Sequence, residues 1–196
     1  MLEQRIQQQF FESADLKYQA AETLARPIHQ AVQAFEASLT AGGRVLVAGH
    51  GPAACLAPLM AQLLVGRFER DRPGLAALAL GGDAALAAVT DGALAGLLAR
   101  QVQTLGQPGD LLLLIDADGD APAMLAAAAA AQGQDISIVA LTGGTGSPLA
   151  AVLGETDVLV AVPHQRRARV MEALLLVLHC LCDAIDLQLM GEQDPE

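Results

Sequence analysis

One short run, Val45-Leu-Val-Ala-Gly-His-Gly-Pro52, predicts a buried strand followed by a glycine-containing turn. Four consecutive apolar residues, without alternating polar side chains, are typical of a parallel strand that is covered on both faces. Four further runs share this character, at residues 76–80, 111–115, 136–141 and 158–162. Because helical segments separate these runs, we expect an α/β fold with a doubly wound parallel sheet of five strands between two helical layers.

Two helices are expected before the first strand. Apolar residues recur at helical spacing over residues 3–25 and again from Ile28 to Leu39. Pro27 lies between the two segments and is expected to end the first helix. The chain is therefore interpreted as a single domain, residues 1–196, with an N-terminal helical arm (1–42) and an α/β core (43–196). A long apolar helix, roughly 166–189, is expected to close the core.

Composition limits the possible partners and the compartment. The formal net charge of -11 repels a phosphate backbone, so direct binding of nucleic acid is not expected. The longest apolar run, residues 173–182, is shorter than the roughly 20 residues that a membrane crossing needs, and no membrane partner is expected. Three cysteines in apolar surroundings argue against a disulfide framework. These features predict a cytoplasmic protein.

Four strands are each followed by a loop, at the edge of the sheet where open α/β proteins bind ligands. These loops cover residues 49–52, 81–83, 116–120 and 142–147. The candidate ligand pocket comprises residues in and just after the first and third loops. They are Gly49, His50, Gly51, Ala53, Asp116, Asp118, Gly119 and Asp120.

Three segments carry a family resemblance: Arg44–Gly51, Gly66-Arg-Phe-Glu-Arg-Asp-Arg-Pro73 and His179-Cys-Leu-Cys-Asp183, the last preceded by Ala168, Arg169 and Glu172. In these residues the chain resembles the sugar isomerase (SIS) family, in the branch of phosphoheptose isomerases and DnaA initiator-associating (DiaA) proteins. Segments 66–73 and 179–183 are most similar to the DiaA proteins. The resemblance implies a sheet of flavodoxin-like strand order, a homotetramer and, in phosphosugar-binding members, a phosphate held by serines and backbone amides of the first and third loops.

Both loops depart from that family pattern. Ala53 stands where the resemblance implies a serine, and the third loop has lost two serines and gained Asp116, Asp118 and Asp120. Two unit charges 4 Å apart interact by ~1 kcal/mol in water and ~4 kcal/mol at an effective dielectric constant near 20. Three carboxylates therefore oppose a bound phosphate, and phosphosugar binding of the usual family kind is not expected.

The residues that the resemblance implies for isomerase chemistry are also replaced. A His and a Glu are implied after the first loop, with a Gln and a His on the last helix, for proton transfer and a zinc site. Here Leu59, Leu63 and Met171 occupy three of these positions, and only His179 remains. A leucine cannot transfer a proton, and one histidine is too few ligands for zinc. No metal and no cofactor is expected.

For each of two histidines, the sequence leaves two interpretations open. His179 shares a narrow stripe of its helix with Glu172 and Asp183, so it is either a residual acid–base group tuned by carboxylates or a hydrogen-bonded histidine of a buried helix. His50 either faces a ligand or is a turn residue without a further role.

Two clusters of charged residues also keep two interpretations each. The three aspartates of the third loop either hold a divalent cation or form a solvated loop that caps the next helix. The basic cluster of Arg166, Arg167 and Arg169 either neutralises an acidic partner or the loop aspartates, or is a surface patch at a helix start.

Two functional hypotheses follow. The first is a non-catalytic homotetrameric adaptor that, as the resemblance implies, binds a DnaA-like initiator protein and assists its assembly at the replication origin. Leu189 and Met190, near the end of the last helix, are then candidate partner-facing residues. The second is an enzyme like phosphoheptose isomerase, or a sugar-phosphate-binding protein, with a rearranged site that uses His179 and Glu172.

Overall fold

The computed structural model describes residues 1–82, 94–144 and 146–192; Asp83 and Thr145, which belong to two of the predicted loops, lie outside them. Five parallel strands form one sheet in the order β2-β1-β3-β4-β5. The strands are β1 (Val45–Gly49), β2 (Ala77–Ala79), β3 (Leu111–Asp116), β4 (Ser137–Gly143) and β5 (Val158–Val162). The predicted parallel sheet and its flavodoxin-like order are confirmed.

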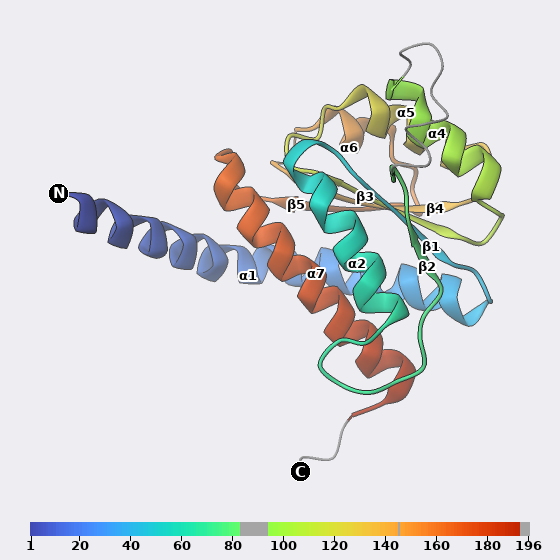
Figure 1. Cartoon of the computed structure of the whole chain (residues 1–196), viewed down its shortest axis with the longest axis horizontal. Helices are drawn as coiled ribbons and strands as arrows, with labels where there is room; N and C mark the ends of the chain where they lie inside the picture. Colours follow the sequence, from blue (N-terminus) through green and yellow to red (C-terminus); the bar gives the residue numbers. More distant parts are fainter. Residues whose placement is uncertain (83–93, 145, 193–196) are drawn as a thin grey trace.

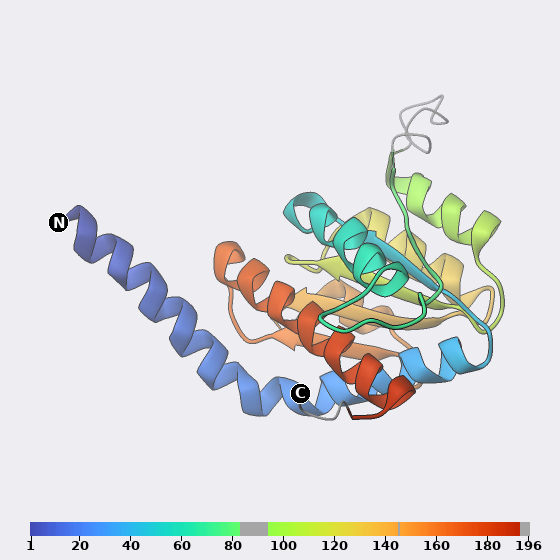
Figure 2. The ribbon, with the colours of Figure 1, turned by 60° about the horizontal axis from the view of Figure 1, so that its bottom comes forward.

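Helices cover both faces of the sheet (Figure 2). One face packs against α1 (Leu2–Thr40), α2 (Leu56–Val65) and α7 (Arg167–Met190), and the 3-10 turn η1 (Gly51–Cys55) joins β1 to α2. The other face carries α4 (Leu94–Leu105), α5 (Pro122–Gln132) and α6 (Pro148–Val152). The three-layer architecture expected from the sequence is therefore present.

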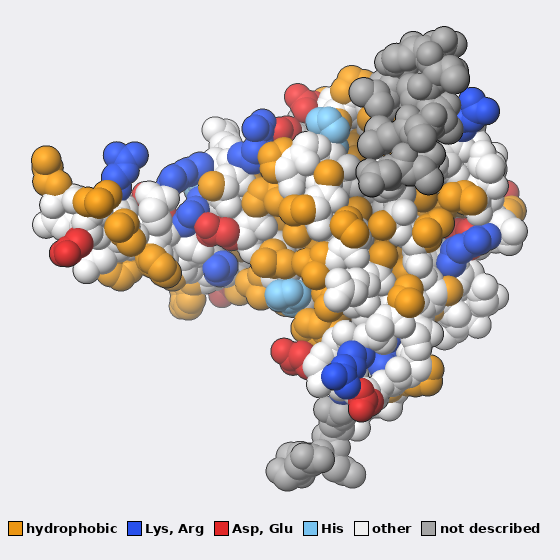
Figure 3. Space-filling view, viewed as in Figure 1, with side chains coloured by type: hydrophobic (Ala, Val, Ile, Leu, Met, Phe, Trp, Pro, Cys, Tyr) orange, Lys and Arg blue, Asp and Glu red, His pale blue; other side chains and the backbone are white. Residues whose placement is uncertain are grey.

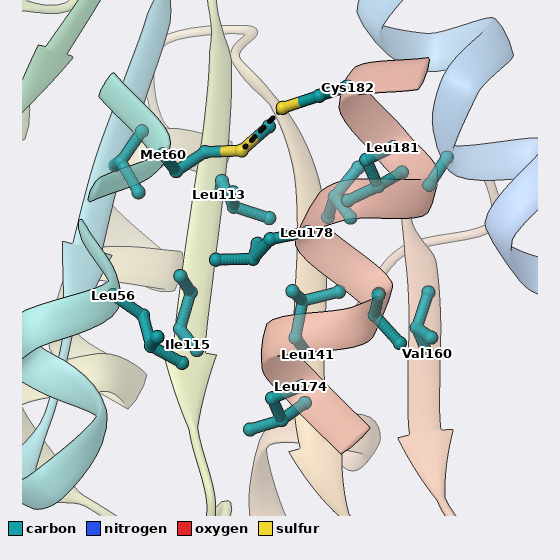
Figure 4. Packing of buried hydrophobic residues seen from close by; sticks show 14 of the residues in the cluster. Leu56, Met60, Leu113, Ile115, Leu141, Val160, Leu174, Leu178, Leu181 and Cys182 are labelled. Atoms are coloured by element: carbon teal, nitrogen blue, oxygen red, sulfur yellow. Dashed lines mark hydrogen bonds between the residues drawn. The ribbon is translucent and has the colours of Figure 1, made fainter. Parts of the chain in front are cut away.

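Alternation along β3 explains why its apolar run has no polar face. Leu111 and Leu113 belong to the core beneath α1, α2 and α7, whereas Leu112 and Leu114 belong to the core beneath α4 and α5. Side chains of a strand point alternately to the two faces, so a strand between two helical layers must be apolar throughout. Figure 4 shows the first of these cores between the sheet, α2 and α7.

One helix, α1, replaces the two N-terminal helices that the sequence predicts. It runs from Leu2 to Thr40 with Pro27 inside it. Proline removes one backbone hydrogen bond and bends a helix, and Figure 2 shows that α1 is bent. Buried residues on both sides of the proline, including Leu24, Ala31 and Phe35, pack into the same core and keep the chain helical.

The first half of α1 extends away from the rest of the molecule (Figures 1 and 2). Its first buried residue is Leu16, and large apolar side chains before that point are exposed. Within the described ranges, none of the helices is both long and apolar enough to span a membrane.

Candidate functional site

The first and third predicted loops meet between β1 and β3, where the order of successive strands in the sheet reverses. From β1 the chain continues to β2 on one side, while β3 lies on the other, so the loops after β1 and β3 flank the switch point at which open α/β sheets bind ligands. Gly49 pairs in register with Ile115, and the His50 amide donates a hydrogen bond to the Ile115 carbonyl at 3.0 Å. The structure thus places the predicted pocket residues of both loops together.

Asp116 is the buried anchor of this site, with 1% of its surface exposed. Its Oδ1 accepts a hydrogen bond from the Asp118 amide at 3.3 Å, and its Oδ2 accepts one from the Ala121 amide at 3.1 Å. His50 Nδ1 lies 3.6 Å from Asp116 Oδ1. Two amides that could face an anionic ligand are therefore already bound by a carboxylate of the same loop.

That arrangement refines the two interpretations of the aspartate loop. Ala121 is the residue that precedes the first turn of α5, so Asp116 does help to cap that helix. It is buried, however, whereas the capping interpretation expects a solvated loop; Asp118 and Asp120 are the exposed members. Among the residues that the structure describes, no group of three or more His, Cys, Asp or Glu side chains could hold a metal ion. The three aspartates therefore do not converge on one point.

Arg167 pairs with the second aspartate of the loop. Its Nε and Nη2 donate to Asp118 Oδ1 at 3.0 Å and Oδ2 at 2.6 Å, a bidentate geometry that fixes the loop against the start of α7. The hydrogen bond to Asp118, reinforced by the charges of Asp118, Asp116 and Asp120, raises the pKa of Arg167. For Arg167, the structure supports the interpretation in which the basic cluster neutralises a loop aspartate.

The other two arginines of the cluster hold the N-terminal arm. Arg166 donates to Glu12 Oε2 at 2.5 Å and to Gln9 Oε1 at 2.7 Å. Arg169, which is buried, donates to the Gln9 carbonyl at 2.5 Å and to Glu172 Oε1 at 2.6 Å. The start of α7 therefore joins the loop site to the first turns of α1.

Close backbone packing leaves little space at the base of the loops. Gly119 has φ +70°, and a Cβ there would clash with the side chain of Ser147. Ser147 is itself buried, and its hydroxyl accepts a hydrogen bond from the Ala150 amide at 3.2 Å, which caps α6. Ala53 is fully buried, so the position of the expected serine carries a methyl group within the core.

The positions implied for catalysis lie on α2 and α7. Leu59, Leu63 and Met171 are half-buried and pack against the main core. His179 is also half-buried, and its ring centroid lies 5.6 Å from that of Phe68. Hydrophobic side chains gather over this face of the molecule in the space-filling view (Figure 3).

Glu172 and His179 do not form an acid–base pair within this chain. Seven residues of α7 separate them, which is about 10 Å along the helix axis at 1.5 Å per residue. Glu172 Oε1 is held by Arg169, and the His179 ring lies against Phe68. Proton transfer between the two residues is therefore not supported by the fold of one chain.

The sequence did not predict a buried ion pair that joins the loop after α2 to the second half of α7. Arg72 Nε donates to Asp186 Oδ1 at 2.5 Å, and the two side chains are 1% and 3% exposed. The same guanidinium donates to the carbonyls of Leu64 at 2.9 Å and Leu63 at 2.8 Å, which caps the end of α2. Asp186, a charged residue between the apolar residues Ile185 and Leu187 of α7, was the signal that could have revealed this pair.

Leu189 and Met190 lie at the end of α7, beside the end of α1. Leu189 is half-buried and Met190 is exposed. Both line a surface hollow of about 360 Å³, whose other walls include Leu39 and Leu75. The two predicted partner-facing residues are thus adjacent on the surface and lie away from the loop site.

The strand order and the loops at its switch point define the class: an open, doubly wound α/β domain with a buried carboxylate at the base of the loops where such folds bind ligands. The SIS domain family matches residues 9–143. The chain is 53% identical to the phosphoheptose isomerase of Methylibium petroleiphilum over 99% of this chain and 98% of the relative. It is therefore a member of the SIS domain family.

Relatives with two different names share this family. The chain is 42% identical to the DnaA initiator-associating protein DiaA of Yersinia pseudotuberculosis, over 99% of this chain and 100% of that protein. It is also similar to the solved structure of the phosphoheptose isomerase of Neisseria gonorrhoeae, with a TM-score of 0.89, 36% identity and coverage of 95% of this chain and 99% of that one. The predicted branch of the family is thereby confirmed.

Proposed function

We propose that this protein is a non-catalytic SIS adaptor. In this proposal the whole chain, residues 1–196, acts as one domain of a cytoplasmic homotetramer that binds a DnaA-type initiator protein and promotes its assembly at the replication origin. The DiaA relatives, which match the chain over nearly its full length, support the choice of partner.

The observation that carries the non-catalytic part is that Leu59 and Leu63 on α2 and Met171 on α7, three of the positions implied for catalysis, are apolar residues packed against the main core. An aldose–ketose isomerase must move protons between neighbouring carbon and oxygen atoms of its substrate. Hydrocarbon and thioether side chains have no exchangeable proton and cannot act as general acids or bases. The one titratable group left at these positions, His179, lies against the ring of Phe68.

The loop site supports the same proposal. A phosphate group is bound by backbone amides and hydroxyls that are free to donate hydrogen bonds. Here the Asp116 carboxylate accepts from two loop amides, and Ala53 supplies no hydroxyl. An anion would also approach the exposed carboxylate of Asp120. The loop site of this chain therefore favours neither a phosphosugar substrate nor its product.

The shape of α1 supports assembly of several copies. Its N-terminal half exposes a stripe of apolar side chains, among them Ile6 and Phe10. An apolar groove of about 470 Å³ lies between α1 and α7, with Leu24, Leu176 and Val177 among its walls. Burial of such surfaces is the main driving force for association. A tetramer would present several initiator sites, which raises the effective concentration of bound initiators without new contacts.

The competing function is an isomerase or a sugar-phosphate-binding protein, which the 53% identity to a phosphoheptose isomerase favours. Purified protein incubated with sedoheptulose 7-phosphate distinguishes these possibilities, with a phosphoheptose isomerase relative as the positive control. We expect no turnover and no saturable binding. Turnover would overturn the non-catalytic assignment, and saturable binding without turnover would identify a sugar-phosphate-binding protein.

The partner is tested by retention of the initiator protein from the same organism on the immobilised full-length chain. We expect retention by the wild-type protein, and weaker retention by the variant Ile6→Glu with Phe10→Glu, in which the proposed association is blocked. Gln7→Glu, an exposed substitution on the same helix, is the matched control. Absence of retention by the wild-type protein would overturn the adaptor proposal.

A further inference from the structure

A further pocket lies where the loop after α2 meets the end of α7, away from the loop site at the sheet. Its volume is about 310 Å³. Four carboxylate side chains line it, together with Phe68, Arg70 and Leu187; the carboxylates belong to Glu69, Asp183, Asp186 and Glu192. Four carboxylates around one hollow create a strongly negative local potential.

Asp186 indicates that this pocket is more than an acidic surface patch. It is 2% exposed, and only its Oδ1 is paired, with Arg72. Its Oδ2 is buried and has no hydrogen-bond partner among the described residues. Buried carboxylate oxygens are almost always hydrogen-bonded, because an unpaired one loses its hydration without compensation. Asp186 lines the pocket, so a donor bound there would supply the missing interaction after a small shift of the side chains that now cover Oδ2.

The charges around the pocket do not balance. Arg72 is taken up by Asp186 and by the carbonyls at the end of α2. Arg70 is the one cation among the described residues that line the pocket, and its Nη1 donates to the Gly191 carbonyl at 2.8 Å. The three remaining carboxylates, of Glu69, Asp183 and Glu192, carry three negative charges against the one positive charge of Arg70. The pocket therefore has an excess of two negative charges. The last turn of α7 contains no basic residue, so the negative end of the helix dipole adds to this excess.

The cation that fits is organic. Among the described residues no group of three or more His, Cys, Asp or Glu side chains could hold a metal ion, so the carboxylates of this pocket are too dispersed for one. A guanidinium or ammonium group spreads several donors over a larger volume and can reach separate carboxylates. The stem of a Lys or Arg side chain would contact Phe68 and Leu187, the apolar part of the wall.

The pocket lies beside the predicted partner-facing end of α7. Met190 is four residues after Asp186 and three after Leu187, so all three share one side of the helix. We propose that this acidic pocket binds a Lys or Arg side chain of the protein partner that docks on the end of α7. This inference rests on the adaptor function proposed above and specifies the chemistry of its partner.

Two substitutions test the pocket without disturbing the buried ion pair. Asp183→Asn and Glu69→Gln each remove one charge from an exposed side chain and keep its shape. Glu155→Gln, at an exposed glutamate that does not line the pocket, is the control for net charge. We expect the double variant to bind the initiator about tenfold more weakly than the wild-type protein and with less dependence on salt, whereas Glu155→Gln binds normally.

A probe that does not require the initiator separates this inference from the adaptor proposal. N-acetyl-arginine amide is titrated into the full-length protein and followed by NMR shifts of residues 183–192. Saturable shifts that disappear in the double variant support a cation pocket, whether or not the initiator is retained. If the shifts are seen but no initiator is retained, the pocket stands, and the adaptor function and the protein partner are overturned. Normal initiator binding by the double variant would overturn the pocket as the partner's contact, and no saturable shifts in the wild-type protein would overturn the pocket itself.

Discussion

Arg72 and Asp186 illustrate how much one residue pair organises in this protein. The pair joins the loop after α2 to α7, and the guanidinium also caps the end of α2. Both charges are removed from water, so the attraction between them mainly offsets their desolvation. The loss of one partner of this ion pair is costly, because the other charge then remains buried and unpaired.

We predict that Asp186→Asn lowers the free energy of unfolding by about 3 to 5 kcal/mol, the usual cost of breaking a buried ion pair. Urea unfolding of the purified variant measures this change. The exposed pair of Arg67 and Asp71 provides the control, and Asp71→Asn should cost less than about 1 kcal/mol. Equal effects of the two substitutions would contradict the structural role of Asp186.

Cys182 predicts a pH dependence of stability. Burial and the negative charge of Asp186 raise the pKa of its thiol from 9.0 to about 12, and the positive charge of Arg72 opposes this rise. Between these values the unfolded chain loses a proton that the folded chain keeps, so stability from this group is complete below pH 9 and declines as pH rises toward 12. The decline approaches about 1.4 kcal/mol for each pH unit.

The variant Cys182→Ala should therefore lose less stability than the wild-type protein between pH 8 and pH 10.5, as measured by urea unfolding at several pH values. It loses the contact of the thiol with Met60 Sδ at 3.7 Å, visible in Figure 4, so a modest loss of stability at all pH values is also expected. Cys55→Ala, at an exposed cysteine, is the control. Parallel pH curves for the wild-type protein and Cys182→Ala would show that the thiol does not titrate as predicted.

At the scale of elements, α2 and α7 have become packing helices on the face where the family resemblance implies catalytic groups. The implied positions on these helices are apolar, and the core beneath the helices is continuous with the sheet (Figure 4). In the loops after β1 and β3, Ala53 supplies no hydroxyl and Asp116 occupies two loop amides. The helices and the loops therefore both support the proposal of a non-catalytic protein.

This view predicts that restoring the polar residues on the helices alone does not restore an isomerase. The triple variant Leu59→His, Leu63→Glu and Met171→Gln should show no turnover of sedoheptulose 7-phosphate, because Ala53 and the aspartates of the third loop still replace the serines that the family resemblance implies for phosphate binding. It should also be less stable by about 1 kcal/mol or more for each leucine removed from the core edge. An activity assay and thermal unfolding test both statements; turnover above that of the wild-type protein would show that the loops accept the substrate.

At the scale of the whole molecule, the exposed half of α1 is the most unusual surface. Leu2, Ile6 and Phe10 are spaced four residues apart and form one stripe of the helix, and Phe10 is 73% exposed. An apolar stripe on a projecting helix is costly in water unless another surface covers it. The groove between α1 and α7 is an apolar surface of matching character on the same chain.

We therefore predict that Ile6→Glu with Phe10→Glu reduces the molar mass measured by light scattering after gel filtration, from that of a tetramer to that of a dimer or monomer. The fold should persist, because the buried residues of α1 begin at Leu16. Gln7→Glu, which adds a charge on the same helix, should leave the mass unchanged. A tetramer in the double variant, or a monomeric wild-type protein, would contradict this assembly.

The sequence by itself determined the layers, the strands and the loops at the sheet edge. The reason is that apolar runs and helical spacing are local properties, and a run such as 111–115 has few other ways to bury its side chains. It also showed which implied catalytic positions are apolar. The full length of α1 was not predictable, because the packing of residues after Pro27 outweighs the local preference of proline to end a helix.

Tertiary structure alone decided which charged residues meet. Asp116 turns inward to its own loop amides, Arg167 reaches Asp118 across 49 residues, and Arg72 reaches Asp186 across 114. No spacing rule in the sequence links the residues of the two ion pairs, because each pair forms only when the fold brings α7 to a distant segment, whereas the contacts of Asp116 stay within its own loop. The acidic pocket at the end of α7 arises in the same way, from a loop and a helix that are far apart in the chain.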